Sequence, residues 1–173
     1  MERRLAAILA TDVVGYSRLM EADEAGTLSA LKSHRKNLID PEVAGHHGRI
    51  VKLMGDGALV EFGSVIDAVE CAAAIQQSMN ERNAEVPENR RIEFRIGINI
   101  VDIIVEGEYI YGDGVNVAAR LEGLADPGSI CVSQNVFNQI KNKVDLGFED
   151  IGDQRFKNIA EPVHAYRVQF ARP

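Results

Sequence analysis

Two aspartates stand where the chain pattern would bring carboxylates to the edge of a sheet. Asp12 ends a stretch that is almost wholly apolar from Leu5 onward, and Asp56 lies in a Gly-Asp-Gly turn between two other apolar segments. Mg²⁺ takes a few hard oxygen ligands from protein and completes its shell with water and phosphate oxygens. The pair therefore suggests a site for divalent cations and a small phosphorylated substrate. Alternatively, Asp12 caps the following helix and Asp56 only serves the turn.

A second group of polar residues follows in a segment with a helical pattern, residues 113–124. Asn116 and Arg120 are one helical turn apart and therefore project from the same face, and the two alanines between them would let another backbone or subunit come close. A guanidinium group suits phosphate because its planar fork donates two parallel hydrogen bonds. The alternative is an exposed arginine that pairs with Glu122 or Glu108.

Hydrophobic periodicity predicts the elements that must position these residues. The expected strands cover residues 5–14, 49–54, 58–62 and 92–100, and the expected helices cover 23–44 and 65–79. Turns are expected at residues 15–17 and at a hairpin tip around Asp56, because an Asp-Gly step is a strong hairpin signal. After a loop at 106–108 and the helix at 113–124, strands are expected near 130–132 and 163–170.

This order of elements predicts an α+β fold with a ferredoxin-like βαββαβ core and a C-terminal extension. Helices would pack on one face of an antiparallel-rich sheet, and the other face would be left open for a site. With 173 residues, 46% of them hydrophobic, the chain is expected to form a single domain over 1–173.

Charge and composition exclude several classes of function. The formal net charge of −7 leaves no broad cationic surface for nucleic acid. The apolar run at residues 5–10 is too short for a signal peptide or a membrane span. Cys71 and Cys131 show no metal-binding or pairing spacing, which favours core thiols in a reducing, cytoplasmic compartment.

Three separated motifs resemble those of the class III adenylyl and guanylyl cyclases. Residues 10–17 (ATDVVGYS) look like the first metal motif of that family, residues 52–57 (KLMGDG) like the second, and residues 111–122 (YGDGVNVAARLE) like the signature of its catalytic helix. Three motifs in the family's order, on the expected strands and helix, are far more specific than any one of them.

The resemblance implies a role for each matched residue. Asp12 and Asp56 would hold two divalent ions, Mg²⁺ or Mn²⁺, with the carbonyl of Val13 as a further ligand. The amides of the loop Gly15, Tyr16 and Ser17 would cradle phosphates.

The same resemblance implies the groups that act on the rest of the nucleotide. Asn116 would orient the ribose, Arg120 would stabilise charge on the phosphorus in the transition state, and Lys157 would bind the triphosphate. In that family the metal residues and the Asn/Arg residues of one site come from different protomers. The chain would then form a head-to-tail homodimer with shared active sites.

The purine preference is less clearly encoded. Lys52 matches the lysine of adenine-type members, but the partner position, usually Asp, is occupied by Tyr109. A tyrosine hydroxyl can accept from the amine of adenine as well as donate, with less selectivity than a carboxylate. Three outcomes follow: an ATP cyclase of modest selectivity, a site that must rearrange to admit the base, or an unusual substrate. ATP is favoured because Lys52 remains, and Tyr109 could instead pack on the dimer surface.

Two other functions compete with an ATP cyclase. A cyclase-like regulatory domain would bind nucleotide or dimerise without turnover, and a cyclase could accept GTP or both purines. The Gly-Gly-Asp/Glu-Glu-Phe signature of diguanylate cyclases is absent from the sequence. Sensor or repeat domains are expected if the chain is a fragment of a longer protein.

Overall fold

The fold is built around two long central strands, β1 (Glu2–Val13) and β4 (Phe94–Glu106), which pair antiparallel. The computed structural model describes residues 2–107 and 109–170; Glu108, in the predicted loop at 106–108, lies outside them. The register places Asp12 opposite Arg95 and Val13 opposite Phe94. The predicted strand at 5–14 is therefore present, and the one at 92–100 continues to Glu106.

The remaining strands extend this pair into one sheet of order β2-β3-β1-β4-β6-β8-β7, with β5 beside β4. Their bounds are β2 (Arg49–Met54), β3 (Gly57–Phe62), β5 (Tyr109–Tyr111), β6 (Ile130–Ser133), β7 (Gly147–Gln154) and β8 (Val163–Gln169). The first four strands in chain order form the antiparallel β2-β3-β1-β4 arrangement of a βαββαβ core, as predicted. Strand β6 adds parallel to β4 and begins the C-terminal extension.

The helices differ in detail from the sequence pattern. They are α1 (Tyr16–Ala22), α2 (Glu24–His34), α3 (Asp40–Gly45), α4 (Val65–Asn83), α5 (Asp113–Leu124) and α6 (Gln134–Ile140). The predicted helix over 23–44 is divided by a π-helical segment, Arg35–Ile39. Pro41 lies in the first turn of α3 and has no N–H to donate, which disrupts the regular hydrogen-bond ladder there. No described helix combines the length and apolarity needed to cross a membrane.

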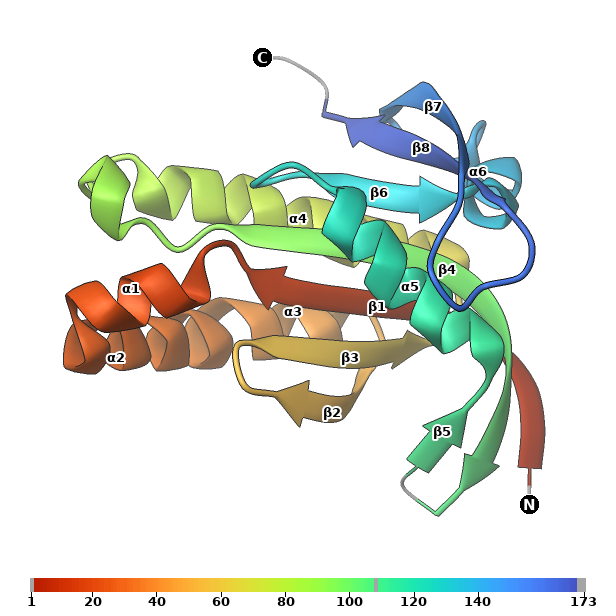
Figure 1. The fold of residues 1–173 in the computed structure, drawn as a ribbon, viewed down its shortest axis with the longest axis horizontal. Coiled ribbons are helices and arrows are strands. Elements are labelled where there is room, and N and C mark those ends of the chain that lie inside the picture. Colours follow the sequence, from red (N-terminus) through yellow and green to blue (C-terminus); the bar gives the residue numbers. More distant parts are fainter. Residues whose placement is uncertain (1, 108, 171–173) are drawn as a thin grey trace.

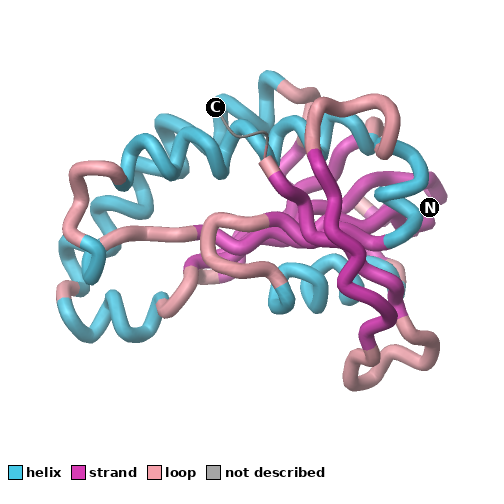
Figure 2. The backbone as a smooth tube through the Cα atoms, turned by 90° about the horizontal axis from the view of Figure 1, so that it is seen from above, coloured by secondary structure: helices cyan, strands magenta, loops and turns pink. Residues whose placement is uncertain are grey.

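Helices cover both faces of the sheet, so the prediction of an open second face was wrong. Helices α2, α3, α4 and α6 lie behind the sheet and α5 crosses its front (Figure 1), and the strands run between helices when seen from above (Figure 2). Alternate residues of β1 divide accordingly: Ala7, Leu9 and Val13 join the core under α4, and Ala6, Ile8 and Ala10 pack with Ala118 of α5. The site residues must therefore be sought around α5.

Gly97 of β4 allows α5 to lie directly on the sheet. A Cβ atom at this position would be 2.3 Å from the amide nitrogen of Glu122 and 2.4 Å from the carbonyl oxygen of Ala118. Both neighbours are backbone atoms and cannot rotate away. The glycine therefore fixes the depth at which α5 sits, and with it the position of every side chain on this helix.

Glu61 joins three strands through a buried carboxylate. Its side chain is 8% exposed and accepts hydrogen bonds from Arg4 of β1 at 2.7 and 3.0 Å and from Arg49 of β2 at 2.7 Å. The hydrogen bond from Arg4 is the main cause of a lowered pKa of Glu61. The carboxylate thereby holds the β2-β3 hairpin, which carries Asp56, against β1, which carries Asp12.

We expect Glu61→Gln to lower the free energy of unfolding by about 2 kcal/mol at neutral pH, because two charged hydrogen-bond donors lose their anion. A lowered folded pKa means that this stability is present above the ordinary value of 4.5 and is lost as the pH falls through the folded value. Urea unfolding of wild type and variant should therefore converge in acid. The assignment of this stability to the Glu61 carboxylate would be contradicted if wild type and variant differed in unfolding free energy by the same amount at low and at neutral pH. An equal loss of unfolding free energy in the exposed-site control Glu70→Gln would contradict it too.

We expect Gly97→Ala to destabilise the fold by about 2 kcal/mol or more, since the new methyl group would overlap the backbone of α5. Gly45→Ala is the matched control, because a Cβ at this helical position meets nothing within 4 Å. That variant should be neutral or slightly stabilising. Thermal melts that rank the two variants in the opposite order would refute this account of α5 packing.

Candidate active site

The tip of the β2-β3 hairpin brings Asp56 to the end of β1 beside Asp12. The Asp56 Oδ2 atom accepts a hydrogen bond from the backbone N–H of Val13 at 3.1 Å. A Cβ atom on Gly57 would lie 2.5 Å from the carbonyl oxygen of Thr11 and 3.4 Å from the Cβ of Asp12, so only glycine permits this approach. The structure therefore brings together the three residues predicted to bind metal, Asp12, Val13 and Asp56.

Two charged residues that the sequence analysis did not select complete this cluster. Arg95 of β4 donates to both carboxylate oxygens of Asp12, from Nε at 3.1 Å and from Nη2 at 2.9 Å. The same Nη2 lies 3.2 Å from Oε2 of Glu122, whose side chain is only 10% exposed. Two features of the sequence could have identified these residues. Arg95 is a charged residue opposite Asp12 in a predicted strand, and Glu122 is a glutamate on the inner face of a predicted helix.

The cluster carries more carboxyl groups than its single guanidinium can balance. Burial first, and then a hydrogen bond with Asp12, raise the pKa of Glu122 to about 8, although Arg95 acts in the opposite direction. The hydrogen bond to Asp12 in turn raises the pKa of Arg95. Together with Asp56, these groups form an acidic site in which an added cation would be favoured.

The donor set fits hard divalent cations. Asp12 and Asp56 offer carboxylate oxygens, and Val13 offers a backbone carbonyl at the same sheet end. Within residues 2–107 and 109–170, no group of three His, Cys, Asp or Glu side chains is arranged to hold a metal unaided. Such a site would draw its other ligands from water and from a phosphorylated substrate, as Mg²⁺ sites commonly do.

The segment predicted as a phosphate-binding turn is in fact the start of a helix. Gly15 has a φ of 61° and immediately precedes α1. The helix begins at Tyr16, because the Gly15 carbonyl already accepts a helical hydrogen bond from the N–H of Leu19. The amides of Tyr16 and Ser17 are therefore first-turn amides without intrahelical partners. The Tyr16 ring packs against the main core, which leaves its backbone as the group available to a ligand.

Helix α5 presents Asn116 and Arg120 away from the sheet that carries Asp12, and Glu122 toward it. Asn116 and Arg120 are exposed, whereas Ala118, Leu121 and Glu122 are buried against the strands. Arg120 donates from Nη2 to the backbone carbonyl of Lys157 at 3.4 Å. The alternative pairing of Arg120 with Glu122 is wrong, because Glu122 bonds with Arg95 instead; Glu108 lies outside the described residues.

Lys157 lies in the loop between β7 and β8, with an exposed side chain. The hydrogen bond to its carbonyl brings this loop to the outer face of α5, so that Arg120 and Lys157 are neighbours. Lys52 of β2 and Tyr109 of β5 are also exposed, Tyr109 to 69%. Among the described residues no hydrogen bond joins Lys52 to Tyr109, and the structure leaves the two separate.

Comparison with known proteins places this geometry in a family. The chain matches the adenylate and guanylate cyclase catalytic domain over residues 3–169. It is 51% identical over 166 residues to a Rhizobium meliloti (strain 1021) protein named "Putative adenylate cyclase 3", covering 96% of the chain and 28% of that relative. The chain thus spans under a third of that relative's length.

Solved structures agree in fold. An adenylate/guanylate cyclase/hydrolase from Silicibacter pomeroyi superposes with a TM-score of 0.90 at 48% identity, with 98% of each chain covered. The adenylyl cyclase CyaB from P. aeruginosa gives a TM-score of 0.82 at 25% identity over 99% of this chain and 98% of that one. With its acidic sheet end and its outward-facing asparagine and arginine, this chain belongs to the family of class III adenylate and guanylate cyclase catalytic domains.

Proposed function

We propose that this chain converts ATP to 3′,5′-cyclic AMP and pyrophosphate at sites shared between two copies arranged head to tail. The observation that carries the proposal is the division of the polar groups between two surfaces. Asp12 and Asp56 lie at one end of the sheet, while α5 turns Asn116 and Arg120 outward, away from that sheet. One chain does not bring these two groups together, but a second copy can place its Asn116 and Arg120 beside the two aspartates of the first.

The first half-site holds the reacting phosphate. The carboxylates of Asp12 and Asp56 and the carbonyl of Val13 would hold two Mg²⁺ or Mn²⁺ ions, and the amides around Gly15, Tyr16 and Ser17 would bind phosphate oxygens. The ions would promote loss of the proton from the ribose 3′-hydroxyl and neutralise the departing pyrophosphate. Asp12 must leave Arg95, at least in part, to serve this role.

The second half-site holds the remainder of the nucleotide. Asn116 would orient the ribose, and Lys157 would bind the triphosphate. As the 3′ oxygen forms its bond to the α-phosphorus, the bond to the pyrophosphate oxygen breaks and the hydroxyl proton passes to solvent. Arg120, already aimed by the Lys157 carbonyl, would stabilise the charge that develops on the phosphorus.

Exposed apolar side chains support an association of two copies. Leu53 and Met54 of β2 are 58% and 39% exposed, and Tyr109 and Tyr111 of β5 are 69% and 52% exposed. A second copy that covers these side chains would remove their apolar surface from water. They lie on the two strands that also carry the predicted base-contacting residues, so an interface there would enclose the purine.

ATP is the proposed substrate because Lys52 can hydrogen-bond the adenine edge and the Tyr109 hydroxyl can accept from its amine. We expect lower selectivity against GTP than an aspartate would give. We also expect the reaction to occur in the cytoplasm, and sensor or repeat domains to regulate it where this chain is part of a longer protein.

A regulatory domain without turnover is the second candidate, favoured by Tyr109 and by the closed Arg95–Asp12 pair. It would be stabilised by ATP, since ligands that bind only the native state raise the melting temperature. The two functions differ in whether cyclic product forms, which the next experiments test.

Asp56→Ala should lower turnover of ATP by about a thousandfold, because removing one of two carboxylates prevents the site from holding both cations. It should cost only about 1 kcal/mol of stability through the lost bond to the Val13 amide. Asp102→Ala, which removes an exposed aspartate of β4, is the control and should retain full activity. Full activity in Asp56→Ala would eliminate the metal assignment.

Mixing two inactive variants, Asp56→Ala and Arg120→Ala, should restore about a quarter of wild-type activity. At equal amounts about half of the dimers are mixed, and each mixed dimer has one intact site of two. The matched control mixes Asp12→Asn with Asp56→Ala; every site then has a defective metal half, and no recovery is expected. Absence of recovery in demonstrably mixed Asp56→Ala/Arg120→Ala dimers would count against shared sites.

A further inference from the structure

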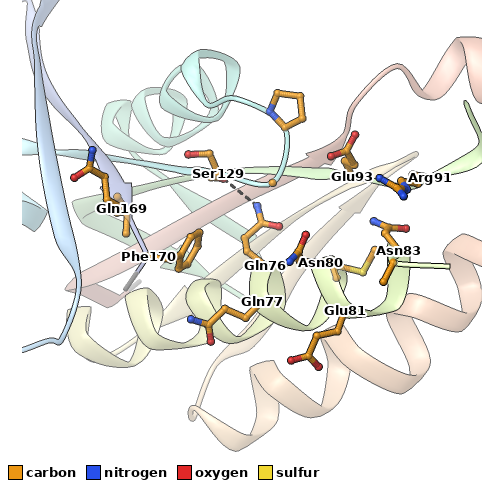
Figure 3. A pocket seen from close by; sticks show the side chains of 15 residues that line it. Gln76, Gln77, Asn80, Glu81, Asn83, Arg91, Glu93, Ser129, Gln169 and Phe170 are labelled. Atoms are coloured by element: carbon orange, nitrogen blue, oxygen red, sulfur yellow. Dashed lines mark hydrogen bonds between the residues drawn. The ribbon is translucent and has the colours of Figure 1, made fainter. Parts of the chain in front are cut away.

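The hairpin tip that carries Asp56 lies against the π-helical segment Arg35–Ile39. Arg35 of this segment and Asp56 of the tip line one small hollow of about 10 Å³, which has room for at most one water. The much larger hollow beside α4, shown in Figure 3, lies elsewhere and is lined by no residue of the proposed nucleotide site. The contact of the tip with the π-helical segment is therefore the one that bears on Asp56.

Arg35 donates hydrogen bonds to the backbone on both sides of Asp56. Its Nη2 atom lies 2.9 Å from the carbonyl oxygen of Gly55 and 3.5 Å from that of Gly57, and the second contact is the weaker. Within residues 2–107 and 109–170, no other side chain donates a hydrogen bond to either carbonyl. One guanidinium group thus joins the two ends of the tip.

The tip has little rigidity of its own. The ladder between β2 and β3 ends at the pair of Met54 and Gly57, so Gly55 and Asp56 form a two-residue turn outside it. Gly55 is exposed and has a φ of 54°. Glycine loses more conformational freedom on folding than any other residue, so a turn with a glycine on each side of its aspartate is costly to hold in one conformation. The hydrogen bonds from Arg35 oppose this freedom.

The π-helical turn coincides with the residue that reaches the tip. The amide of Asp40 bonds to the carbonyl of Arg35, five residues earlier, whereas an α-helix bonds four residues earlier. Leu38 and Ile39 of this turn are buried in the main core, and Arg35 is half-buried and reaches the hairpin. Turns of this kind are rare and occur frequently at functional sites. The segment therefore anchors Arg35 in the core while its side chain contacts the tip.

We propose that Arg35 is a positioning residue that holds the Asp56 carboxylate in place for the divalent cations. It acts through the backbone: with both flanking carbonyls held, the carboxylate stays beside Asp12 and Val13. This role rests on the proposed function, because it requires cations at these three residues. The guanidinium is itself positive and would repel a cation if it acted through charge. Positioning and charge therefore predict opposite effects when Arg35 is removed.

The test is a titration of the purified chain with Mn²⁺ alone, in which unbound Mn²⁺ is measured by electron paramagnetic resonance. Arg35→Met should weaken Mn²⁺ binding about tenfold, because the carboxylate is no longer held, whereas the loss of charge alone would tighten binding. Arg35→Lys keeps the charge and one donor and should recover part of the affinity. Lys36→Met removes an exposed cation of the same turn and should leave the affinity unchanged.

The outcomes separate this role from the cation site itself. Unchanged or tighter Mn²⁺ binding in Arg35→Met, an equal loss in Lys36→Met, or no recovery in Arg35→Lys would overturn the role of Arg35 and leave the cation site standing. Wild-type Mn²⁺ binding that Asp56→Ala does not reduce would overturn the cation site and this role together. Arg35→Gln is too short to span the two carbonyls, carries the same expectation as Arg35→Met, and decides the matter if Arg35→Met does not fold.

Discussion

The antiparallel pairing of β1 with β4 is the constraint on which the rest of the molecule depends. Its register runs without a break from Glu2 opposite Val105 to Val13 opposite Phe94. This pairing sets Asp12 across from Arg95, where the two side chains form a bidentate ion pair. A slip of one residue would send Asp12 to the opposite face of the sheet, away from both Arg95 and α5.

The same strand pair also determines how the site is divided. Gly97 of β4 lets the backbone of α5 touch the sheet, so the inner face of the helix is occupied by Ala118, Leu121 and Glu122. Asn116 and Arg120 lie on the outer face, and they could point toward Asp12 only if α5 were displaced from the sheet. The proposed sharing of the site between two copies would thus follow from backbone packing rather than from any single contact between two chains.

Much of the core was predictable because periodicity reports burial directly. The apolar run before Asp12, the two strands around Gly55–Gly57 and the helix around Val69 and Met79 all appear close to the expected positions. The residues proposed to bind the nucleotide were selected from motifs and from a family resemblance, and the structure adds their surroundings. Arg95 and Glu122 were missed because a charged residue in a strand or helix pattern is usually a solvated one.

The later elements depended on tertiary contacts that no local pattern reports. Strand β5 has only three residues and exists because β4 runs on past Ile100 to pair with it. Helix α6 is seven residues long and depends on the Ser133 cap and on burial of Val136 and Ile140. Among the described residues, strand β7 pairs only with β8 at the edge of the sheet, so its sequence need not alternate. Short or edge elements of this kind carry little periodic signal.

The most direct test of the account is turnover by the purified wild-type chain with ATP and, separately, with GTP, in Mg²⁺ and in Mn²⁺, with products identified by mass. The account predicts cyclic AMP and pyrophosphate in equal amounts, formed only when a divalent cation is present, with GTP a poorer substrate. Stabilisation of the protein by ATP without any cyclic product, at high protein and metal concentrations, would contradict it and favour a regulatory domain.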